Sequence, residues 1–272
     1  KTGHSLIKSK MAETNSPPRN VGGITGLVMG YLMKQGGAAV PSANRITLLR
    51  DTNGDGVADI VIGASGDDNN GENSIGVASG SNYDLSPAHL DKAMDSIISA
   101  DVVLTQLETP INTVEYLAKI VSTQTSTFIL NPAPAQPLSD ELLQNLDVIT
   151  PNETEAEQLT GLKVTNAESA QSSCNKLHDL GVQTVIITMG RKGAYLSCSN
   201  AHQLIPSYDV NAVDTTGAGD IFNGVLAVEL SNKKDFPEAI KYANAAAALS
   251  VTVLGAQPSA PTSDAIKELL SK

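Results

Sequence analysis

Short apolar runs alternate with amphipathic segments from residue 101 to the end of the sequence. Runs of strand length cover 101–108, 127–134, 147–152 and 182–190. Apolar residues at helical spacing mark the segments 111–124, 139–146, 152–161, 167–181, 218–232, 236–255 and 262–272. Alternating strands and helices usually form a parallel sheet with helices on both faces. We therefore predict an α/β fold with a doubly wound, mainly parallel sheet.

Two further short runs, 193–199 and 201–207, predict a β-hairpin. Residues 1–70 differ, because they are rich in Gly, Asn, Asp and Ser and lack the alternation. The sequence thus divides into an atypical N-terminal segment, 1–70, and an α/β domain, 71–272.

Within the N-terminal segment, the apolar flanks 45–50 and 58–63 enclose an acidic turn and favour a β-hairpin. The stretch 21–40 is the most apolar early part of the chain. Lys34 and several glycines interrupt it, so it suits a short, loosely amphipathic helix better than a membrane span.

Composition narrows the class of partner. The 272 residues carry a net charge of −11 and no Trp, which disfavours nucleic acids and membrane surfaces as partners. The two cysteines, Cys174 and Cys198, have neither metal-ligand nor redox spacing. No secretory signal opens the sequence, so we expect a cytoplasmic protein.

Polar residues follow several of the predicted strands. Asn131 follows the apolar run "TFIL", Asn152 follows "DVIT", and Thr188 ends "TVIIT". The stretch "VDTTGAGDIFNG" (213–224) opens a helix with a Gly-Ala-Gly turn. Ligands of doubly wound sheets bind at the carboxyl ends of the strands. Glycine-rich turns at helix starts hold phosphate through free N–H groups, and Asp220 places a carboxylate at the same point.

These motifs together resemble the ribokinase-like (phosphofructokinase B type) carbohydrate kinases over residues 71–272. The resemblance rests on "GENSIGVASGSN", "LTQLETP", "LNPAPA", "ITPNETEAEQLTG", "VIITMGRKGAYL", "VDTTGAGDIFNG" and "YANAAAALSVTVLGAQPS", with "DTTGAGD" the most specific part. It implies ATP-dependent phosphoryl transfer to a sugar, with D-ribose as substrate and D-ribose 5-phosphate as product. The partners expected are a small sugar and a nucleotide.

For catalysis, the resemblance implies that Asp220 takes the proton from the sugar hydroxyl. The backbone N–H groups of Ala218, Gly219 and Asp220 can form an anion hole at the helix start, and Gly217 belongs to the same catalytic turn. A helix-capping role for Asp220 is the alternative. Glu108 resembles a sugar-contacting acid, and Asp220 would also contact the sugar. An ordinary acid at a strand end is the alternative for Glu108.

The nucleotide site implied by the resemblance draws on Asn152, Thr188, Gly190, Arg191, Gly193, Gly219 and Asn244. Glycines of a strand-to-hairpin turn are an alternative for this loop. Glu155 would help organise Mg²⁺ through water. Its alternative is an acid that complements a helix N-terminus.

The resemblance also implies a K⁺ site, in which most ligands are backbone carbonyl oxygens. The residues matching that site are Asp214, Thr216, Val251, Leu254, Ala256 and Ala260. Family members carry a sugar-binding Asp, a Gly-Gly-Lys-Gly-type motif and a β lid through which relatives dimerise. None of the three is found in residues 1–70, so we expect a monomer or a weak homodimer.

Residues 11–70 resemble a fragment of sorbosone-dehydrogenase-like and FG-GAP propeller repeats, too short to form a propeller. Within them, Asp51, Asn53, Asp55 and Asp59 have the spacing of a Ca²⁺ loop, and an acidic turn is the alternative.

Two further functions therefore stay open beside the kinase. One is a nucleotide-binding protein with weak or no kinase turnover, because the N-terminal sugar motifs are not found. The other is a calcium-binding extracellular module.

Overall fold

The computed structural model describes residues 46–48, 61–64, 74–77 and 80–272. The expected helix over 21–40 and the calcium-loop residues Asp51, Asn53, Asp55 and Asp59 lie outside these residues. The same holds for most of the propeller-like stretch.

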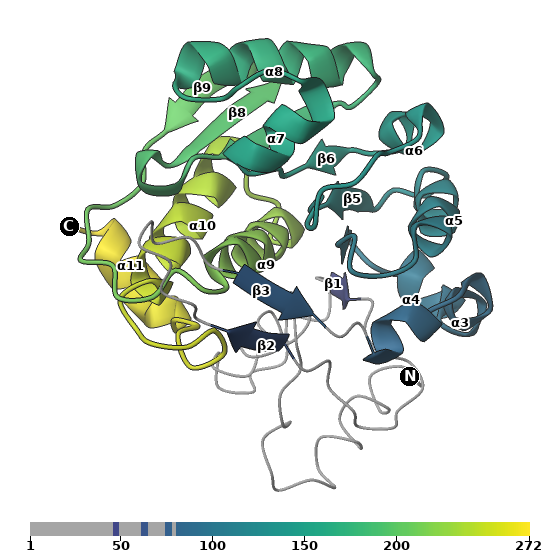
Figure 1. The fold of residues 1–272 in the computed structure, drawn as a ribbon, viewed down its shortest axis with the longest axis horizontal. Helices are drawn as coiled ribbons and strands as arrows, with labels where there is room; N and C mark the ends of the chain where they lie inside the picture. Colours follow the sequence, from purple (N-terminus) through teal and green to yellow (C-terminus); the bar gives the residue numbers. More distant parts are fainter. Residues whose placement is uncertain (1–45, 49–60, 65–73, 78–79) are drawn as a thin grey trace, which may run out of the picture.

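A seven-stranded sheet forms the centre of the molecule (Figure 1). The first five strands in spatial order pair in parallel. The last two join the sheet at one edge through antiparallel pairs. This confirms the doubly wound, mainly parallel sheet and the hairpin. In spatial order the strands are β1 (Ile46–Leu48), β4 (Val102–Thr105), β5 (Thr127–Leu130), β6 (Val148–Ile149), β7 (Thr184–Thr188), β8 (Ala194–Cys198) and β9 (Ala201–Ile205).

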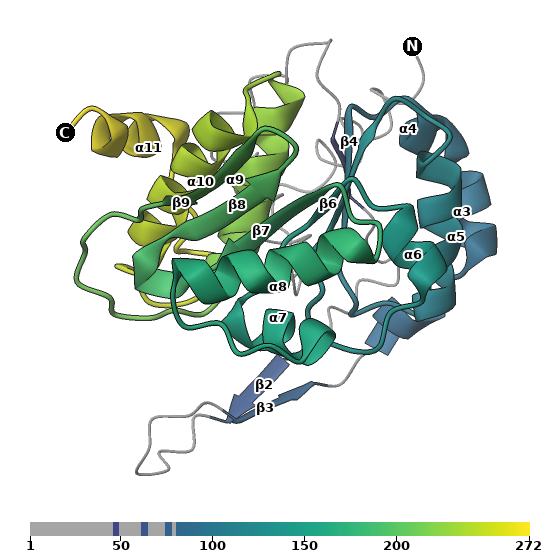
Figure 2. The ribbon, with the colours of Figure 1, turned by 90° about the horizontal axis from the view of Figure 1, so that it is seen from above.

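Helices pack on both faces of the sheet. One face carries α3 (Pro87–Lys92), α4 (Met94–Ile98), α5 (Ile111–Val121), α6 (Asp140–Gln144), α7 (Glu153–Thr160) and α8 (Ala167–Asp179). The other carries α9 (Ala218–Ser231), α10 (Phe236–Ser250) and α11 (Ser263–Leu270). Figures 1 and 2 show β8 between α8 and α10.

Alternate residues of each central strand enter opposite cores. In β7, Ile186 packs against α9 and α10, whereas Val185 and Ile187 pack on the α8 side. In β5, Ile129 packs in the core on the α9 and α10 side, whereas Phe128 packs in the core on the α8 side. Because successive strand residues point to opposite faces, a strand covered on both faces is apolar throughout, as its sequence shows.

The expected hairpin between 45–50 and 58–63 is wrong. Strand β1 pairs in parallel with β4 in the main sheet. Strand β2 (Val61–Ala64) instead pairs antiparallel with β3 (Ser74–Val77), in a two-stranded ribbon apart from that sheet (Figure 2). An acidic turn favours a hairpin only weakly, and the unpaired edge of β4 offers a competing row of hydrogen-bonding groups.

Other boundaries differ for local reasons. The helix expected over 236–255 ends at Ser250, where the Val251 carbonyl accepts hydrogen bonds from Val213 and Asp214. A 3-10 helix, η1 (Gly80–Asp84), and the short helices α3 and α4 were not expected. Elements of five or six residues hold too few apolar positions for a period to be recognised.

We expect Ile186→Ala to lower the free energy of unfolding by about 2–5 kcal/mol, because it leaves a cavity between the sheet and α9. Ile186→Val should lower it by about 0.5–1.5 kcal/mol. Urea unfolding followed by circular dichroism measures both.

Leu204→Ala is the matched control, since Leu204 is on the edge strand and 38% exposed. An equal loss of stability in the Leu204 and Ile186 variants would contradict the assignment of Ile186 to a close-packed core.

Candidate active site

A buried chain of hydrogen bonds joins the carboxyl ends of two strands to the start of α9. The Asn131 amide donates to the Thr150 carbonyl over 3.1 Å, and the Thr150 hydroxyl donates to Asn223 Oδ1 over 2.6 Å. Asn223 Nδ2 then donates to the Gly219 carbonyl over 2.9 Å. Because Asn131, Thr150 and Asn223 are all buried, this chain fixes the first turn of α9 against the sheet.

The first turn of α9 leaves backbone donors open. Gly217 caps the helix in a left-handed conformation (φ 76°), and the Ala218 N–H donates to Thr215. The N–H groups of Gly219 and Asp220 have no hydrogen-bond partner among the described residues. A Cβ added at Gly219 would meet no atom within 4 Å. Close packing therefore does not require a glycine at position 219. A group that approaches the start of the helix would explain why the side chain is missing there.

Asp220 lies on this turn and is only partly exposed. Its Oδ1 accepts a hydrogen bond from Gln106 Nε2 over 3.1 Å. Burial, with smaller contributions from the negative charges of Glu108 and Glu155, raises the pKa of Asp220 to about 7. A carboxylate with this pKa can accept and release a proton near neutral pH.

Glu155 and Asn152 form a reciprocal cap at the start of α7. The Asn152 side chain accepts from the Glu155 N–H, and the Glu155 carboxylate accepts from the Asn152 N–H, each over 2.8 Å. Burial raises the pKa of Glu155, and the hydrogen bond from Asn152 opposes the shift. The structure thus brings Glu155 near Asp220 while using one of its oxygens for capping.

The predicted nucleotide loop adjoins this cap. Thr188 at the end of β7 forms a parallel bridge with Asn152, and its N–H donates to Pro151 over 2.9 Å. A short 3-10 helix, η2 (Gly190–Lys192), follows. Thr188 and Asn152, which are 36 positions apart in sequence, therefore lie side by side at the carboxyl ends of β7 and β6.

The glycines of the loop have different surroundings. Gly190 has a φ of 52°, and a Cβ there would meet nothing within 4 Å. Gly193 has a φ of 104°, and a Cβ there would lie 2.1 Å from the Ile205 carbonyl oxygen. Packing against the end of β9 therefore explains Gly193, as the turn alternative expects, whereas the space beside Gly190 is open.

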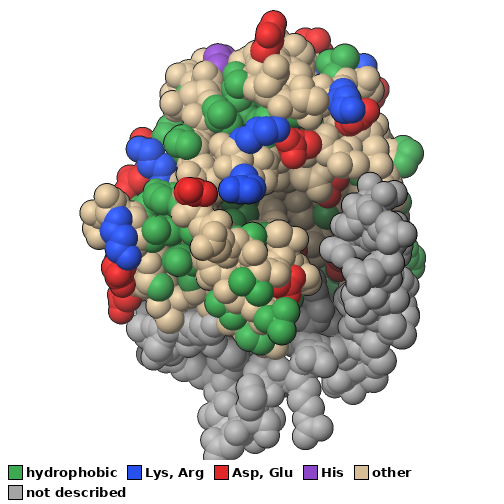
Figure 3. All heavy atoms as spheres, turned by 60° about the vertical axis from the view of Figure 1, so that its left-hand side comes forward, with side chains coloured by type: hydrophobic (Ala, Val, Ile, Leu, Met, Phe, Trp, Pro, Cys, Tyr) green, Lys and Arg blue, Asp and Glu red, His purple; other side chains and the backbone are tan. Residues whose placement is uncertain are grey.

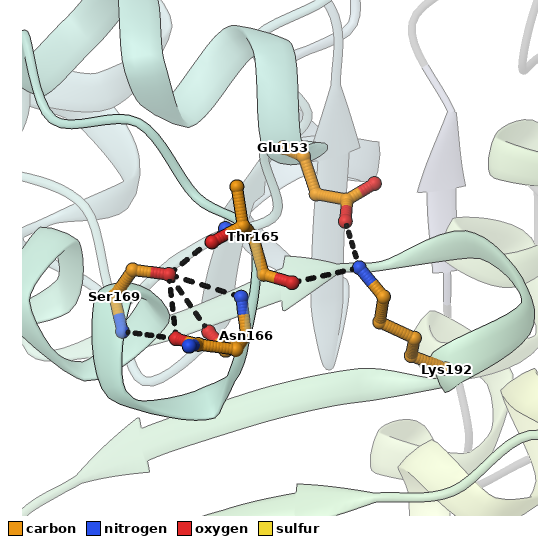
Figure 4. A network of polar contacts seen from close by, with 5 residues as sticks. All are labelled: Glu153, Thr165, Asn166, Ser169 and Lys192. Atoms are coloured by element: carbon orange, nitrogen blue, oxygen red, sulfur yellow. Dashed lines mark hydrogen bonds and ion pairs between the residues drawn. The ribbon is translucent and has the colours of Figure 1, made fainter.

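Lys192 holds the loop to its neighbours. Its ammonium donates to Glu153 Oε1 over 3.2 Å and to the Thr165 carbonyl over 2.8 Å. Figure 4 shows how these contacts continue to Ser169 and Asn166, the N-cap of α8. Lys192 thereby ties η2 to the starts of α7 and α8.

Arg191 points to the surface, where it pairs with Asp209 at 3.6 Å and is 88% exposed. In Figure 3, Lys and Arg side chains of the described residues lie beside Asp and Glu side chains, around a hollow, and do not form one basic patch. Such exposed pairs contribute little to stability, so Arg191 is free to change partners.

Asn244 is buried in α10, away from open space. Its amide donates to the carbonyls of Ile205 (3.0 Å) and Pro206 (3.2 Å). In this structure Asn244 therefore holds the end of β9 against α10. A nucleotide contact would have to use the other side of the amide.

Asp214 joins the two segments of the predicted K⁺ site. Its Oδ1 accepts from the Thr216 N–H over 2.9 Å and its Oδ2 from the Gly255 N–H over 2.8 Å. Hydrogen bonds, first from the Thr216 side chain and then from the two N–H groups, lower the pKa of Asp214. A permanent negative charge therefore lies between the segments 214–216 and 251–260.

The carbonyls of the second segment differ in availability. The Val251 carbonyl already accepts from the N–H groups of Val213 (2.7 Å) and Asp214 (3.1 Å), which uses both of its lone pairs. Leu254 is 74% exposed, Ala256 is partly buried and Ala260 is buried. Leu254 and Ala256 thus have more freedom to turn a carbonyl toward a cation than Val251.

Within the described part of the chain, no three His, Cys, Asp or Glu side chains gather in a geometry that would hold a metal ion. Cys174 and Cys198 are buried free thiols. No helix among the described residues is long and apolar enough to cross a membrane.

Three side chains at this site escaped the sequence analysis: Gln106, Thr150 and Asn223. Gln106 and Asn223 lie inside the quoted stretches "LTQLETP" and "VDTTGAGDIFNG". Their positions beside Glu108 and Asp220 were the available signal. The hydrogen bonds that give them a role join positions up to 114 residues apart, which no local pattern reveals.

A mainly parallel sheet with an acid at a glycine-rich helix start is the arrangement that the resemblance to carbohydrate kinases predicts, and sequence comparison agrees on the family. The chain belongs to the pfkB family of carbohydrate kinases, whose model matches residues 64–263.

Ribokinase of Haemophilus influenzae is 48% identical over 199 residues, which cover 73% of this chain and 65% of that protein. Ribokinase of Staphylococcus aureus is 42% identical, covering 73% of this chain and 66% of that one. The chain thus spans just under two thirds of the length of these relatives.

The solved structures agree on the fold. The structure of Thermotoga maritima ribokinase is 37% identical with a TM-score of 0.67, covering 75% of this chain and 67% of that chain. Arabidopsis thaliana ribokinase, complexed with ribose and ATP, is 34% identical with a TM-score of 0.68, covering 75% and 66%.

We expect Asp220→Asn to stabilise the fold at high pH. The folded pKa of Asp220, about 7, exceeds the ordinary value of 3.8, so the carboxyl destabilises the folded state increasingly as pH rises between these values. At pH 8 the free energy of unfolding of the variant should exceed that of the unmodified protein by about 1–3 kcal/mol. Below pH 4 the two values should be almost equal. Thermal unfolding at both pH values measures the difference.

Asp84→Asn, on an exposed residue, is the control and should change stability by less than about 0.5 kcal/mol at either pH. A gain for Asp220→Asn that is the same at both pH values would contradict a carboxyl whose pKa is raised in the folded state.

Proposed function

We propose that the chain is an ATP-dependent carbohydrate kinase that converts D-ribose to D-ribose 5-phosphate. One observation carries this proposal: Asp220, with its raised pKa, lies on the same helix turn as the open N–H groups of Gly219 and Asp220. A proton acceptor and an anion-binding turn at one point are what phosphoryl transfer to a hydroxyl requires. The ribokinase names of the relatives support the choice of sugar.

In this mechanism Asp220 accepts the proton of the sugar hydroxyl as that oxygen attacks the γ-phosphorus of ATP. Because the pKa of Asp220 is about 7, the ionised form is present at neutral pH and the proton can be released again. The N–H groups at the start of α9 bind the phosphoryl oxygens, and Glu108 contacts the sugar beside Asp220. ADP leaves as the second product.

The nucleotide is proposed to lie along the loop after β7, beside Thr188 and Gly190, with Asn152 next to the phosphates. The bridge between Thr188 and Asn152 supports this placement. Arg191, which has only a weak exposed partner, can swing toward the phosphates. Gly193 and Asn244 support the loop through their contacts with the end of β9.

Mg²⁺ would neutralise charge on the ATP phosphates when bound. The donor set fits an indirect site, because the partly buried Glu155 keeps one oxygen in its cap and stands near Asp220. Mg²⁺ retains most of its water ligands, so Glu155 would orient one of these waters.

We further propose K⁺ as an activator, bound by Asp214, Thr216 and carbonyls of Leu254, Ala256 and Ala260. Val251 would join them only after giving up an internal hydrogen bond. A monomer or weak homodimer remains a prediction, as does a cytoplasmic location, which the two buried free thiols support.

A nucleotide-binding protein with weak turnover is the second candidate. Among the described residues, only Glu108 and Asp220 are proposed to contact the sugar. Catalysis depends strongly on positioning, so a loosely held sugar would react slowly. A calcium-binding module remains a prediction on Asp51, Asn53, Asp55 and Asp59, and an unchanged melting temperature in Ca²⁺ titration would count against it.

Replacing Asp220 tests the kinase directly. We expect Asp220→Asn to lower ribose-dependent ADP release by about 10²–10⁴-fold, because it removes the proton acceptor. The dissociation constant for ATP, measured by calorimetry, should change by less than about threefold, since the backbone donors remain.

Asp84→Asn should leave both ribose-dependent ADP release and the dissociation constant for ATP unchanged. ATP binding without ribose-dependent release in the unmodified protein would favour the second candidate, and absence of ATP binding would refute both.

Replacing Asp214 tests the K⁺ site. We expect Asp214→Asn to raise the K⁺ concentration for half-maximal activation by about tenfold or more, because it removes the lasting charge between the two segments. Activity titrated with KCl at constant ionic strength measures this, with Asp84→Asn as a control on an exposed acid. The same K⁺ concentration for half-maximal activation in both variants would contradict a cation site at Asp214.

A further inference from the structure

Gln106 contacts the proposed catalytic carboxylate directly. It follows the last residue of β4, and its Nε2 donates to Asp220 Oδ1 over 3.1 Å. An ionised carboxylate only accepts hydrogen bonds, so the Gln106 amide must present its N–H group to it. The contact spans 114 residues of sequence.

The backbone around Gln106 is held on both sides. The Leu107 N–H donates to the Ala133 carbonyl over 3.0 Å, and Gln136 Nε2 donates to the Leu107 carbonyl over 3.3 Å. The Thr105 hydroxyl donates to the carbonyl of Gln106 itself over 3.3 Å. The loop after β5 therefore fixes the direction from which the Gln106 side chain extends.

Asp220 is anchored to the same part of the sheet. The Gly219 carbonyl, next to Asp220, is joined through Asn223 and Thr150 to Asn131, the residue that follows β5. Gln106 and Asp220 thus both rest on the end of β5. A donor and an acceptor with a shared rigid support keep their distance without loss of side-chain entropy at each turnover.

The chemistry of the partner also matters. Burial and the negative charges of Glu108 and Glu155 raise the pKa of Asp220, whereas a Lys or Arg partner would lower it. An amide carries no net charge. It can therefore orient a carboxylate while leaving it basic enough to take a proton.

We propose that Gln106 is a positioning residue for proton transfer: its amide holds Oδ1 of Asp220 and leaves Oδ2 directed at the attacking hydroxyl. The inference rests on the proposed kinase function. Its physical core, the hydrogen bond to the ionised carboxylate, can be measured without turnover.

The first experiment titrates the Asp220 carboxyl by ¹³C NMR in protein labelled at aspartate, with Asp220→Asn to assign the signal. Gln106→Leu should raise the pKa of Asp220 by about one unit, because the ionised form loses its donor. Gln136→Leu is the matched control, since it removes an amide hydrogen bond of the same loop without touching Asp220.

An unchanged pKa in folded Gln106→Leu would overturn the inference, and so would an equal rise in Gln136→Leu. Gln106→Glu is a second variant of the same shape, in case the leucine variant does not fold. It replaces the donor by a further negative charge, so the pKa of Asp220 should rise by more than one unit.

The second experiment follows ribose-dependent ADP release against pH. Gln106→Leu should lower kcat about 10- to 100-fold, leave KM for ATP within about threefold, and move the acid limb of kcat/KM up by the shift found by NMR. A fall in kcat with an unmoved acid limb would indicate a general structural defect and overturn the inference. Absence of turnover in the unmodified protein would refute the kinase, while the carboxyl titration would still decide the role of Gln106.

Discussion

The site depends on keeping one carboxylate, Asp220, partly out of water beside two others. Removing a charge from water is unfavourable, and Glu108 and Glu155 add to the penalty, which raises the pKa of Asp220 to about 7. The start of α9 and the Gln106 amide offset part of it with dipoles rather than opposite charges. Such an arrangement favours proton transfer near neutral pH at the expense of stability.

The parallel sheet makes this arrangement possible. Its strands end at one edge, so loops distant in sequence deliver Gln106, Asn131 and Thr150 to the first turn of α9. The supporting groups are uncharged and hydrogen-bonded, and Asn131 and Thr150 are buried, which makes the turn rigid at little electrostatic cost. The antiparallel strands β8 and β9 extend the sheet and hold the loop that bears Gly190 and Gly193.

Several proposed ligand contacts also serve the fold. Asn152 and Glu155 cap α7, Asn244 ties α10 to the end of β9, and Asp214 joins two loop segments. At Glu155 and Asn152, helix capping and ligand binding are compatible, because a cap fixes a carboxylate as firmly as it satisfies a helix end. Binding a ligand at these residues would then adjust an existing hydrogen-bond network rather than create one.

The sequence by itself determined the α/β class, the doubly apolar strands and the clustering of motifs at strand ends, because these follow from local periodicity and from glycine and acid placement. It did not determine that Ile46–Leu48 joins β4, that α10 stops at Ser250, or that Gln106 contacts Asp220. Each of these depends on which hydrogen-bonding groups a distant segment leaves open. Only the tertiary structure decides such long-range pairings.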